Sequence, residues 1–338
     1  MSPLVQADIL NLARNFMECR ILLSGAELDL FTLLTPKPLS AREVTDRVDA
    51  RFEGADLRGI TIHLDALSAI GLLIKEEGTY HCPSSISASL SSESSESPNS
   101  ILPFVLHMAN VWKRWSSLTP VVYGSPSRDK PDAPPGSVRD MSAFIGAMHV
   151  IASPIAPRIV AAVHPQSSRA LLDVGGAMGT YTNAFLQAVP QMKATLFDQP
   201  EAIEIARKFL MDIGILHRVT LVQGDFYQDE FPGGHDLAFV SAIIHQNSPE
   251  QNLNLFLKVF RSLDPGGRII IRDHVMEPDR IRPKNGAIFA VNMLVATDGG
   301  KTYTFDEIKT SLLQAGFLNI RLLQSGEHMD GLVEAFKP

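Results

Sequence analysis

Apolar residues in the first hundred positions recur at intervals of three and four, the spacing of an amphipathic helix. The run from Leu10 to Leu34 predicts two helices. Ser40 and Glu43 form the pattern of a capping box, so a helix is expected to start there. A further helix is predicted over residues 57–70, and the segment LLIKEEGTYHC after it predicts strand, glycine turn and strand. Helices followed by such a hairpin are typical of a winged-helix domain.

The pattern changes twice before the second half of the chain. Residues 84–100 contain ten serines and predict a mobile surface connector. Residues 101–118 have helical spacing again, whereas residues 125–138 are rich in proline and polar residues and predict another loop. Residues 141–162 predict one long helix that leads into a second domain, with the boundary between residues 140 and 165.

From Arg169 onward, short apolar runs alternate with helical patterns. The predicted strands are ALLDV, KATLFD, VTLVQGD, DLAFVSAIIH and GRIIIRDHV. This alternation predicts a parallel sheet covered by helices on both faces. Ligands of such sheets bind beyond the carboxyl ends of the strands, so polar residues at those ends are the candidates for function.

Composition and charge narrow the possible functions. A chain of 338 residues with 45% hydrophobic and 20% charged residues predicts a globular protein of two domains. The net charge is −7, and residues 1–100 hold eight Lys or Arg against fourteen Asp or Glu, a net charge of −6. Such a surface repels phosphate, which opposes DNA binding. Because the apolar helices of this domain have more nonpolar surface than a small wing can cover, we expect the domain to pack subunits together. A DNA-binding or ligand-sensing regulator remains the alternative from a different class of protein.

Cysteine and histidine usage bears on compartment and metal binding. Cys19 and Cys82 are the two cysteines, so neither a disulfide framework nor a cysteine metal site is expected. The ten histidines show no metal-ligand spacing, and we expect a reaction without a metal. Without a signal sequence or an apolar run of about 18 residues, the chain is expected to be cytoplasmic and independent of membranes. Nucleic acid is not an expected partner.

Three successive strand ends carry a pattern that suits a nucleoside. The loop DVGGAMG lets the backbone approach a ligand closely, but it departs from the dinucleotide spacing and has no lysine for phosphate. Asp198, at the end of the next strand, can accept hydrogen bonds from ribose hydroxyls. Asp225 and Phe226 follow the third strand and offer a carboxylate to an exocyclic amine and an aromatic face to adenine. S-adenosylmethionine (SAM), which lacks phosphate and carries an ammonium, fits this set best.

The motifs DVGGAMG, FDQP and GDF resemble, in order and spacing, those of the SAM-dependent O-methyltransferases of the plant caffeate and hydroxyindole type and their bacterial small-molecule relatives. The resemblance covers essentially the whole chain. It implies a class I methyltransferase fold, a Rossmann-like doubly wound sheet, with an N-terminal, mainly helical winged-helix dimerisation domain and a homodimer. The expected domains are residues 1–105 for dimerisation, 106–165 as a helical linker to the substrate pocket, and 166–338 for cofactor and catalysis. The implied cofactor-binding residues are Asp173, Gly175, Gly176, Gly179, Asp198, Gln199, Gly224, Asp225, Phe226 and Ser241, the last standing where the family often has lysine.

His245 is the candidate general base. It follows an apolar strand, and an imidazole can take a proton from a hydroxyl at neutral pH. The resembled family has its catalytic histidine at this point, in an LHDW segment, whereas this chain has His245-Gln246-Asn247. Asp273 stands at the position of the family's first acidic partner, and Thr302 replaces the second. With one carboxylate missing, we expect weaker proton abstraction or a more acidic acceptor.

The acceptor pocket is expected on segments that resemble those lining the cavity in relatives, with the residues Trp115, Phe144, Met148, Asn292 and Met293. Of the other histidines, His274 is a candidate neighbour of the site because it stands next to Asp273, although strand alternation points it to the opposite face; His149 is a weaker candidate still. The resulting hypothesis is O-methylation of an aromatic or polyketide-like small molecule. The altered residues at His245-Gln246-Asn247 and Thr302 keep two alternatives open, C-methylation and a homologue that binds the cofactor without methylating.

Overall fold

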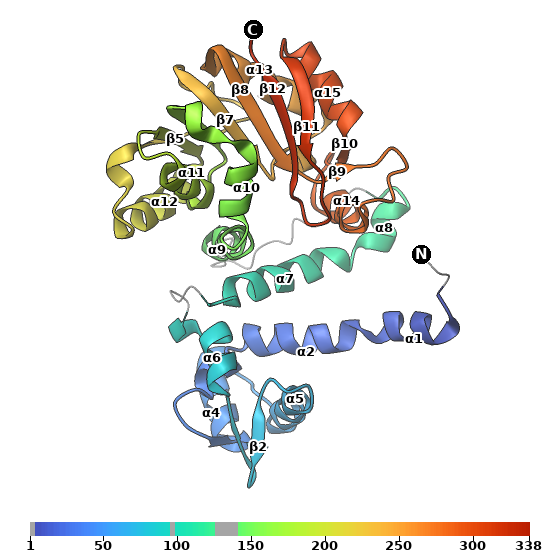
Figure 1. The fold of residues 1–338 in the computed structure, drawn as a ribbon. Coiled ribbons are helices and arrows are strands. Elements are labelled where there is room, and N and C mark those ends of the chain that lie inside the picture. The colour runs from blue at the N-terminus through green and yellow to red at the C-terminus, as the bar shows by residue number, and fades with distance from the viewer. Residues whose placement is uncertain (1–3, 95–98, 126–140) are drawn as a thin grey trace. The chain divides into compact units, whose positions relative to one another are not determined.

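The computed structural model describes residues 4–94, 99–125 and 141–338, which belong to two compact units, Met1–Lys113 and Arg114–Pro338 (Figure 1). The loop predicted over residues 125–138 lies outside the described residues, apart from Ser125. The three-part division at residues 105 and 165 stays a prediction.

The first unit is mainly helical and carries a small sheet. Its helices are α1 (Gln6–Arg14), α2 (Phe16–Glu27), α3 (Leu30–Leu33), α4 (Ala41–Phe52), α5 (Leu57–Ala69), α6 (Ser84–Leu90) and α7 (Leu102–Trp115), whose last two residues belong to the second unit. Strands β1 (Leu39–Ser40), β2 (Ile74–Glu76) and β3 (Thr79–His81) pair in the order β1-β3-β2. The hairpin and the predicted helices after residue 40 are confirmed, whereas the run from Leu10 to Leu34 forms parts of three helices, α1, α2 and α3, instead of the two predicted. The capping box is also confirmed, because the Ser40 amide donates to Glu43 Oε2 at 2.8 Å and the Glu43 amide donates to Ser40 Oγ at 3.3 Å.

The prediction of a connector over residues 84–100 is wrong for its first part. Residues 84–90 form helix α6 and residues 92–94 form a turn of 3-10 helix, while residues 95–98 lie outside the described part of the chain. Ile86 and Leu90 lie four positions apart and pack against the core of the first unit. One apolar stripe is enough to hold a short helix on a core, whatever its serine content.

The second unit contains a seven-stranded sheet in the order β11-β12-β8-β7-β4-β5-β6. Its strands are β4 (Ala170–Val174), β5 (Lys193–Asp198), β6 (Val219–Gln223), β7 (His235–Ser241), β8 (Leu263–Asp273), β11 (Leu318–Gln324) and β12 (Gly331–Phe336). The predicted parallel pairing is confirmed from β6 through β8. Strand β12 is antiparallel to both β8 and β11, a pairing that the short connection from β11 allows and that the sequence pattern did not predict. Two short strands, β9 (Val275–Met276) and β10 (Tyr303–Thr304), pair separately.

Helices cover both faces of this sheet. The helices of the second unit are α8 (Leu118–Val122), α9 (Met141–Ala152), α10 (Ala156–Val163), α11 (Thr180–Ala188), α12 (Pro200–Asp212), α13 (Pro249–Ser262), α14 (Lys284–Ala296) and α15 (Phe305–Gln314). Buried residues of α10 and α11 pack with Leu171, Phe239 and Ile270 on one face, and those of α13 and α15 pack with Leu172, Val240 and Ile271 on the other (Figure 1). The two layers of helices confirm the doubly wound arrangement.

The long helix predicted over residues 141–162 is two helices, α9 and α10, bent by 64°. Pro154 and Pro157 lie at the break, and proline removes the amide donor and clashes with the preceding turn of a helix. Among the described residues, no single helix is long and apolar enough to cross a membrane, and only the bent pair α9 and α10 together reaches that length and composition.

The strand order places a switch point beside β4. From β4 the chain builds outward through β5 and β6, then returns to the other side of β4 with β7 and β8. The connections on the two sides of β4 leave in opposite directions, which opens a crevice at the carboxyl ends of the strands. The glycine loop after β4 and the residues after β7 both lie at this edge.

Candidate active site

The loop after β4 can form only with small residues. Gly175 has φ +64° and Gly179 has φ +88°, in the left-handed region that favours glycine. A Cβ atom at Gly176 would lie 2.7 Å from Leu196 Cγ and 3.0 Å from an Asp173 carboxylate oxygen. Ala177 also has a positive φ, and its amide donates to Asp198 Oδ2 at 2.8 Å. The loop is therefore held tightly against the end of β5.

Two carboxylates flank this loop in a poorly hydrated environment. Asp173 is buried at the end of β4 and accepts a hydrogen bond from Thr182 Oγ1 at 2.5 Å. Burial, supplemented by the nearby charge of Asp198, raises the pKa of Asp173 to about 7. Burial also raises the pKa of Asp198, whose Oδ1 accepts from the Gln199 amide at 2.7 Å. A positively charged ligand group would favour the ionised form of both.

The third strand end brings Gly224, Asp225 and Phe226 beside these carboxylates. The Gly224 amide donates to the Asp198 carbonyl at 3.0 Å, and a Cβ at Gly224 would lie 2.3 Å from Phe197 Cζ. Asp225 accepts from the Tyr227 amide at 2.8 Å, and Phe226 is half-buried. Glycines that must stay glycine, acidic residues and an aromatic ring thus meet at one edge, and this set fits SAM, which carries an ammonium, a sulfonium and a ribose diol.

His245 and Asp273 form a buried pair at the same edge. His245 lies in the 3-10 turn η4 (Ile244–Gln246), four residues beyond the end of β7, and Asp273 is the last residue of β8. His245 Nδ1 is 2.9 Å from Asp273 Oδ2 and 3.0 Å from Oδ1. A carboxylate at this nitrogen makes Nδ1 the donor, which leaves Nε2 as the proton acceptor of the neutral ring.

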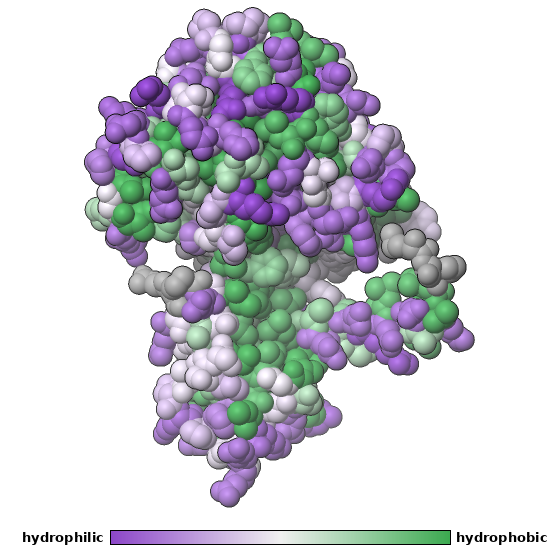
Figure 2. Space-filling view, in the orientation of Figure 1, coloured by the Kyte–Doolittle hydropathy of each residue, from purple (hydrophilic) through white to green (hydrophobic). Residues whose placement is uncertain are grey.

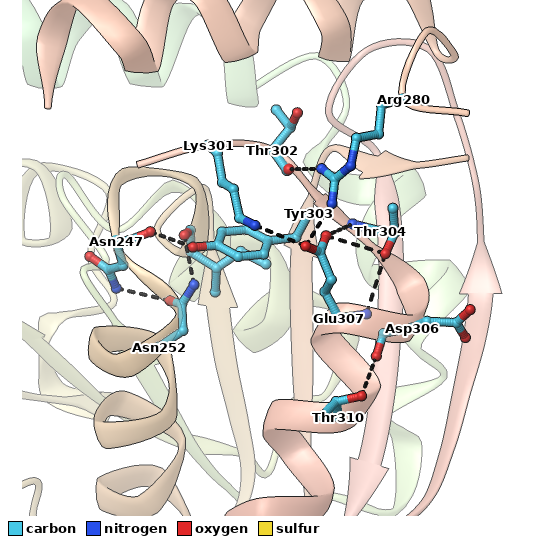
Figure 3. A network of polar contacts seen from close by, with 11 residues as sticks. Asn247, Asn252, Arg280, Lys301, Thr302, Tyr303, Thr304, Asp306, Glu307 and Thr310 are labelled. Carbon is cyan, nitrogen blue, oxygen red and sulfur yellow. Dashed lines mark hydrogen bonds and ion pairs between the residues drawn. The ribbon is translucent and has the colours of Figure 1, made fainter. Parts of the chain in front are cut away.

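Hydrogen bonds of Asn247, Asn252 and Tyr303, which Figure 3 shows together, fix the turn that carries His245. Asn247 accepts from the Tyr227 hydroxyl at 2.7 Å and donates to Asn252 Oδ1 at 3.0 Å. The Tyr303 hydroxyl donates to the Asn247 carbonyl at 2.5 Å, and Asn252 Nδ2 donates to the Ile244 carbonyl at 2.9 Å. Sequence reasoning noted Asn247 only as a departure from the resembled family. Its buried amide links the loop after β6, through Tyr227, to the turn of the candidate base.

The position of His274 differs from the expectation. Its ring and that of His245 both pack against Phe289 of α14, with ring centroids 5.2 Å and 4.8 Å away. Strand β8 ends at Asp273, so alternation no longer sets the direction of residue 274. Burial lowers the pKa of His274 to about 4, which keeps it neutral, and its Nδ1 is buried without a hydrogen bond. Sequence reasoning missed Phe289, although it lies one helical turn before Asn292 in the same apolar run.

Two of the candidate acceptor residues meet directly. Trp115 Nε1 donates to Asn292 Oδ1 at 2.9 Å, which supplies the partner that an amide in an apolar run requires. Met293, next along α14, is buried. Phe144 and Met148 lie one turn apart on α9, the former exposed and the latter half-buried. His149 follows Met148, and its Nδ1 lies 2.7 Å from Thr180 Oγ1 at the start of α11.

The remaining candidates, Ser241 and Thr302, each contact an arginine. Ser241 Oγ accepts from Arg272 Nη1 at 3.1 Å. Thr302 is buried, and its carbonyl accepts from Arg280 at 3.4 Å (Figure 3). Within the described residues, Asp273 is the carboxylate that bonds His245, and no group of three metal-ligating side chains is present.

Comparison with known proteins gives matches over nearly the whole chain. The model of the O-methyltransferase domain family matches residues 132–318. The tetracenomycin polyketide synthesis 8-O-methyl transferase TcmO of Streptomyces glaucescens is 30% identical over 93% of this chain and 92% of its own. The 3-hydroxy-5-methyl-1-naphthoate 3-O-methyltransferase of Streptomyces sahachiroi is 25% identical over 93% of this chain and 90% of its own.

Solved structures agree with these matches. The structure of PigF with S-adenosylhomocysteine (SAH) is 26% identical, covers 99% of this chain and 100% of its own, and has a TM-score of 0.85. The structure of human N-acetylserotonin methyltransferase in complex with SAM is 24% identical, covers 100% of this chain and 99% of its own, and has a TM-score of 0.78. The expected class I methyltransferase fold is thereby confirmed.

Proposed function

The chain belongs to the O-methyltransferase domain family and is a SAM-dependent methyltransferase, and from this premise we propose that it methylates a hydroxyl group of an aromatic or polyketide-like small molecule. Two relatives support this class of acceptor: TcmO is named for polyketide synthesis, and the other O-methyltransferase is named for a hydroxynaphthoate. The observation that carries the proposal is the buried pair of His245 and Asp273 at the carboxyl edge of the sheet, beside the glycine loop.

His245 is the general base in this proposal. When bound, SAM supplies a methyl group on a positively charged sulfur. Asp273 holds the His245 ring through Nδ1 and keeps Nε2 ready to accept the hydroxyl proton. As the proton arrives, the Asp273 carboxylate offsets the positive charge of the ring. Because Thr302 supplies no second carboxylate, the site favours an acceptor that loses its proton readily, which describes a phenol better than an alcohol.

The reaction type can be tested with SAM labelled on its methyl group. Phenols, naphthols and polycyclic polyketide aglycones are the acceptors to offer, and the product to expect is an aryl methyl ether stable to base. Label attached to carbon instead would support the C-methylation alternative. Binding of SAH without transfer to any acceptor would favour a homologue that does not methylate.

We assign the cofactor to the three strand ends that follow β4, β5 and β6. Asp198 is proposed to accept from the ribose hydroxyls, Asp225 from the exocyclic amine of adenine, and Phe226 to contact the adenine ring. Gly175, Gly176, Gly179 and Gly224 let the backbone pack closely on the side chains beneath it, and this backbone is proposed to line the cofactor site. Gln199 contributes its backbone, and Ser241 lies at the end of β7. The acceptor is proposed to lie near Trp115, Phe144, Met148, Asn292 and Met293.

Replacing Asp198 with alanine is expected to weaken SAH binding about 10–100-fold, because hydrogen bonds from ribose to a carboxylate are lost. Isothermal titration calorimetry measures the effect. Asp212→Ala is the matched control, since Asp212 is an exposed carboxylate at the end of α12, and its SAH affinity should not change. Equal affinity for both variants would remove Asp198 from the cofactor site.

We also propose that the chain forms a homodimer through its first unit. Helix α1 has no buried residue, and large apolar side chains are exposed along α1 and the start of α2: Leu4, Val5, Ile9, Leu10, Leu12, Phe16 and Met17. Figure 2 shows these apolar side chains at the surface of the N-terminal helix. An exposed apolar surface of this extent is typical of a protein–protein interface. The acidic charge of residues 1–100 supports packing of subunits over binding of nucleic acid.

The double substitution Ile9→Glu and Leu12→Glu is expected to convert the dimer to a monomer, because it buries two charges in an apolar interface. Sedimentation velocity would show the wild-type protein at twice the 37.0 kDa mass of the chain and the variant at that mass. Ile213→Glu, on an exposed position of the second unit, is the control and should remain dimeric. A monomeric wild-type protein would contradict the proposal.

The cytoplasm is the compartment that we propose, because Cys19 and Cys82 are both free thiols.

A further inference from the structure

Arg272 is a buried cation that no carboxylate of the described residues pairs with. Its side chain, on the penultimate residue of β8, belongs to a residue only 3% exposed. Nη1 donates to Ser241 Oγ at 3.1 Å, whereas Nε is buried and has no hydrogen-bond acceptor. Among the residues that the structure describes, no carboxylate forms an ion pair with this guanidinium. Serine offsets none of its charge.

Tyr181 of α11 lies against the same group. The guanidinium carbon of Arg272 is 5.3 Å from the centroid of the Tyr181 ring, and the Tyr181 hydroxyl is buried without a partner. Two donors, Nε of Arg272 and the hydroxyl of Tyr181, are therefore left unsatisfied in one region. A buried donor without an acceptor costs about 1–3 kcal/mol, and more when it is charged.

An arginine cannot escape this cost by losing its proton, because a guanidinium stays protonated in proteins. The nearby carboxylates have other partners. Asp330 accepts from Arg158 at 3.1 Å, and Asp173 accepts from Thr182. The geometry therefore calls for an anion from outside the chain, and a planar guanidinium suits a carboxylate best, through paired N–H donors.

The position of Arg272 in the sheet indicates which ligand supplies the external carboxylate. Asp173, Ser241 and Arg272 lie at the carboxyl ends of β4, β7 and β8, and alternation points all three to the face covered by α10 and α11. This is the edge where the strand order switches and where ligands of such sheets bind. One end of this row is acidic and the other is basic, a pattern that matches the ammonium and carboxylate of an amino acid.

We propose that Arg272, together with the hydroxyl of Tyr181, binds the carboxylate of the amino-acid tail of SAM, and that Asp173 binds its ammonium. The inference rests on the cofactor and not on the identity of the acceptor. Ser241 holds the guanidinium in place from the neighbouring strand. Sequence reasoning assigned no role to Arg272, because its isolation from other carboxylates is visible only in the folded chain.

The first experiment uses the wild-type protein and three adenosine ligands, measured by isothermal titration calorimetry without acceptor. SAH carries the complete tail, its decarboxylated analogue 5′-deoxy-5′-(3-aminopropylthio)adenosine lacks only the carboxylate, and 5′-methylthioadenosine lacks the whole tail. We expect the decarboxylated analogue to bind about 10–100-fold more weakly than SAH, the effect of losing a charge-assisted hydrogen-bond pair. Equal affinities for SAH and this analogue would overturn the proposal, whatever any variant does.

The second experiment locates the carboxylate on Arg272. Arg272→Met is expected to weaken the binding of SAH about 10–100-fold and to leave the affinity for 5′-methylthioadenosine unchanged. Arg272→Lys keeps the charge without the paired donors, so its affinity for SAH should fall less. Tyr181→Phe should show a smaller loss for SAH alone. Arg207→Met, at an exposed position on α12, is the matched control.

Two results would overturn this assignment. An unchanged SAH affinity in Arg272→Met would mean that the arginine binds another anion, such as an acidic group of the acceptor. An equal loss of affinity for SAH and for 5′-methylthioadenosine in both Arg272 variants would mean that Arg272 has a purely structural role. Because none of these measurements involves methyl transfer, failure here leaves the proposed O-methylation standing, and failure of O-methylation leaves this binding test interpretable.

Discussion

Replacing His245 with alanine is expected to lower the rate of methyl transfer about 10²–10⁴-fold and to leave the affinity for SAH unchanged. The expectation follows from geometry. Nδ1 of His245 lies within hydrogen-bond distance of both oxygens of Asp273, so the ring is fixed and Nε2 is the atom left to take a proton. Turnover measured with labelled SAM, together with calorimetry of SAH on the same preparation, separates loss of catalysis from loss of the fold.

Asp273→Asn tests the other half of the pair. An amide can orient the ring but cannot offset its positive charge, so turnover should fall as well, and the double variant should be little worse than His245→Ala alone because the two act as a unit. His217→Ala, which removes an exposed histidine, is the control. Full activity in His245→Ala would place the base elsewhere, and loss of SAH binding would make His245 a structural residue.

The second large effect is expected from Asp173, in the stability of the ligand-free protein. Burial raises its pKa from 3.8 to about 7. Between these values the folded protein keeps a proton that the unfolded chain has released. The free energy of unfolding therefore falls as pH rises through this window and levels off above about pH 7. A shift of about three units corresponds to about 4 kcal/mol over the whole range.

Asp173→Asn should remove this component, since an amide does not titrate and can still accept from Thr182. Denaturant unfolding of the wild-type protein and the variant between pH 5 and pH 8 is the measurement. The stability of the variant relative to wild type should increase with pH, while Asp212→Asn, at an exposed position, should follow the wild-type curve. Parallel curves for Asp173→Asn and wild type would show that Asp173 ionises normally in the folded protein.

The parts of the fold that were predicted are those that neighbouring residues determine. The capping box of Ser40 and Glu43 acts within one turn of helix, and the glycines of residues 175–179 allow a backbone that other residues rarely adopt. Strand and helix periods extend over a few residues, so the five parallel strands are predicted along the chain, but their order in the sheet is not. Helix α6 and strand β12 were missed, because one is held by a core and the other by partners far along the chain.

The candidate site divides in the same way. Strand ends mark where side chains gather, and this rule alone points to Asp173, Asp198 and Asp225, whereas Asp273 follows from the resemblance to the family. Alternation fails once a strand ends, which is why His274 was expected on the wrong face and its contact with Phe289 was not foreseen. The amide of Asn247 was read as a departure from a family pattern, whereas the folded chain makes it the centre of a buried network.

By itself, the sequence determined the two kinds of domain, the family, the cofactor and the strand ends where chemistry is expected, because periodicity, turn residues and motif spacing are properties of short segments. Only the tertiary structure decided which of those residues touch. It brought Trp115 to Asn292 and left Arg272 buried without a carboxylate partner among the described residues, whereas the contact of His245 with Asp273 is the one that the family resemblance implies. Hydrogen bonding and burial depend on distances between residues far apart in the chain, and those distances exist only after folding.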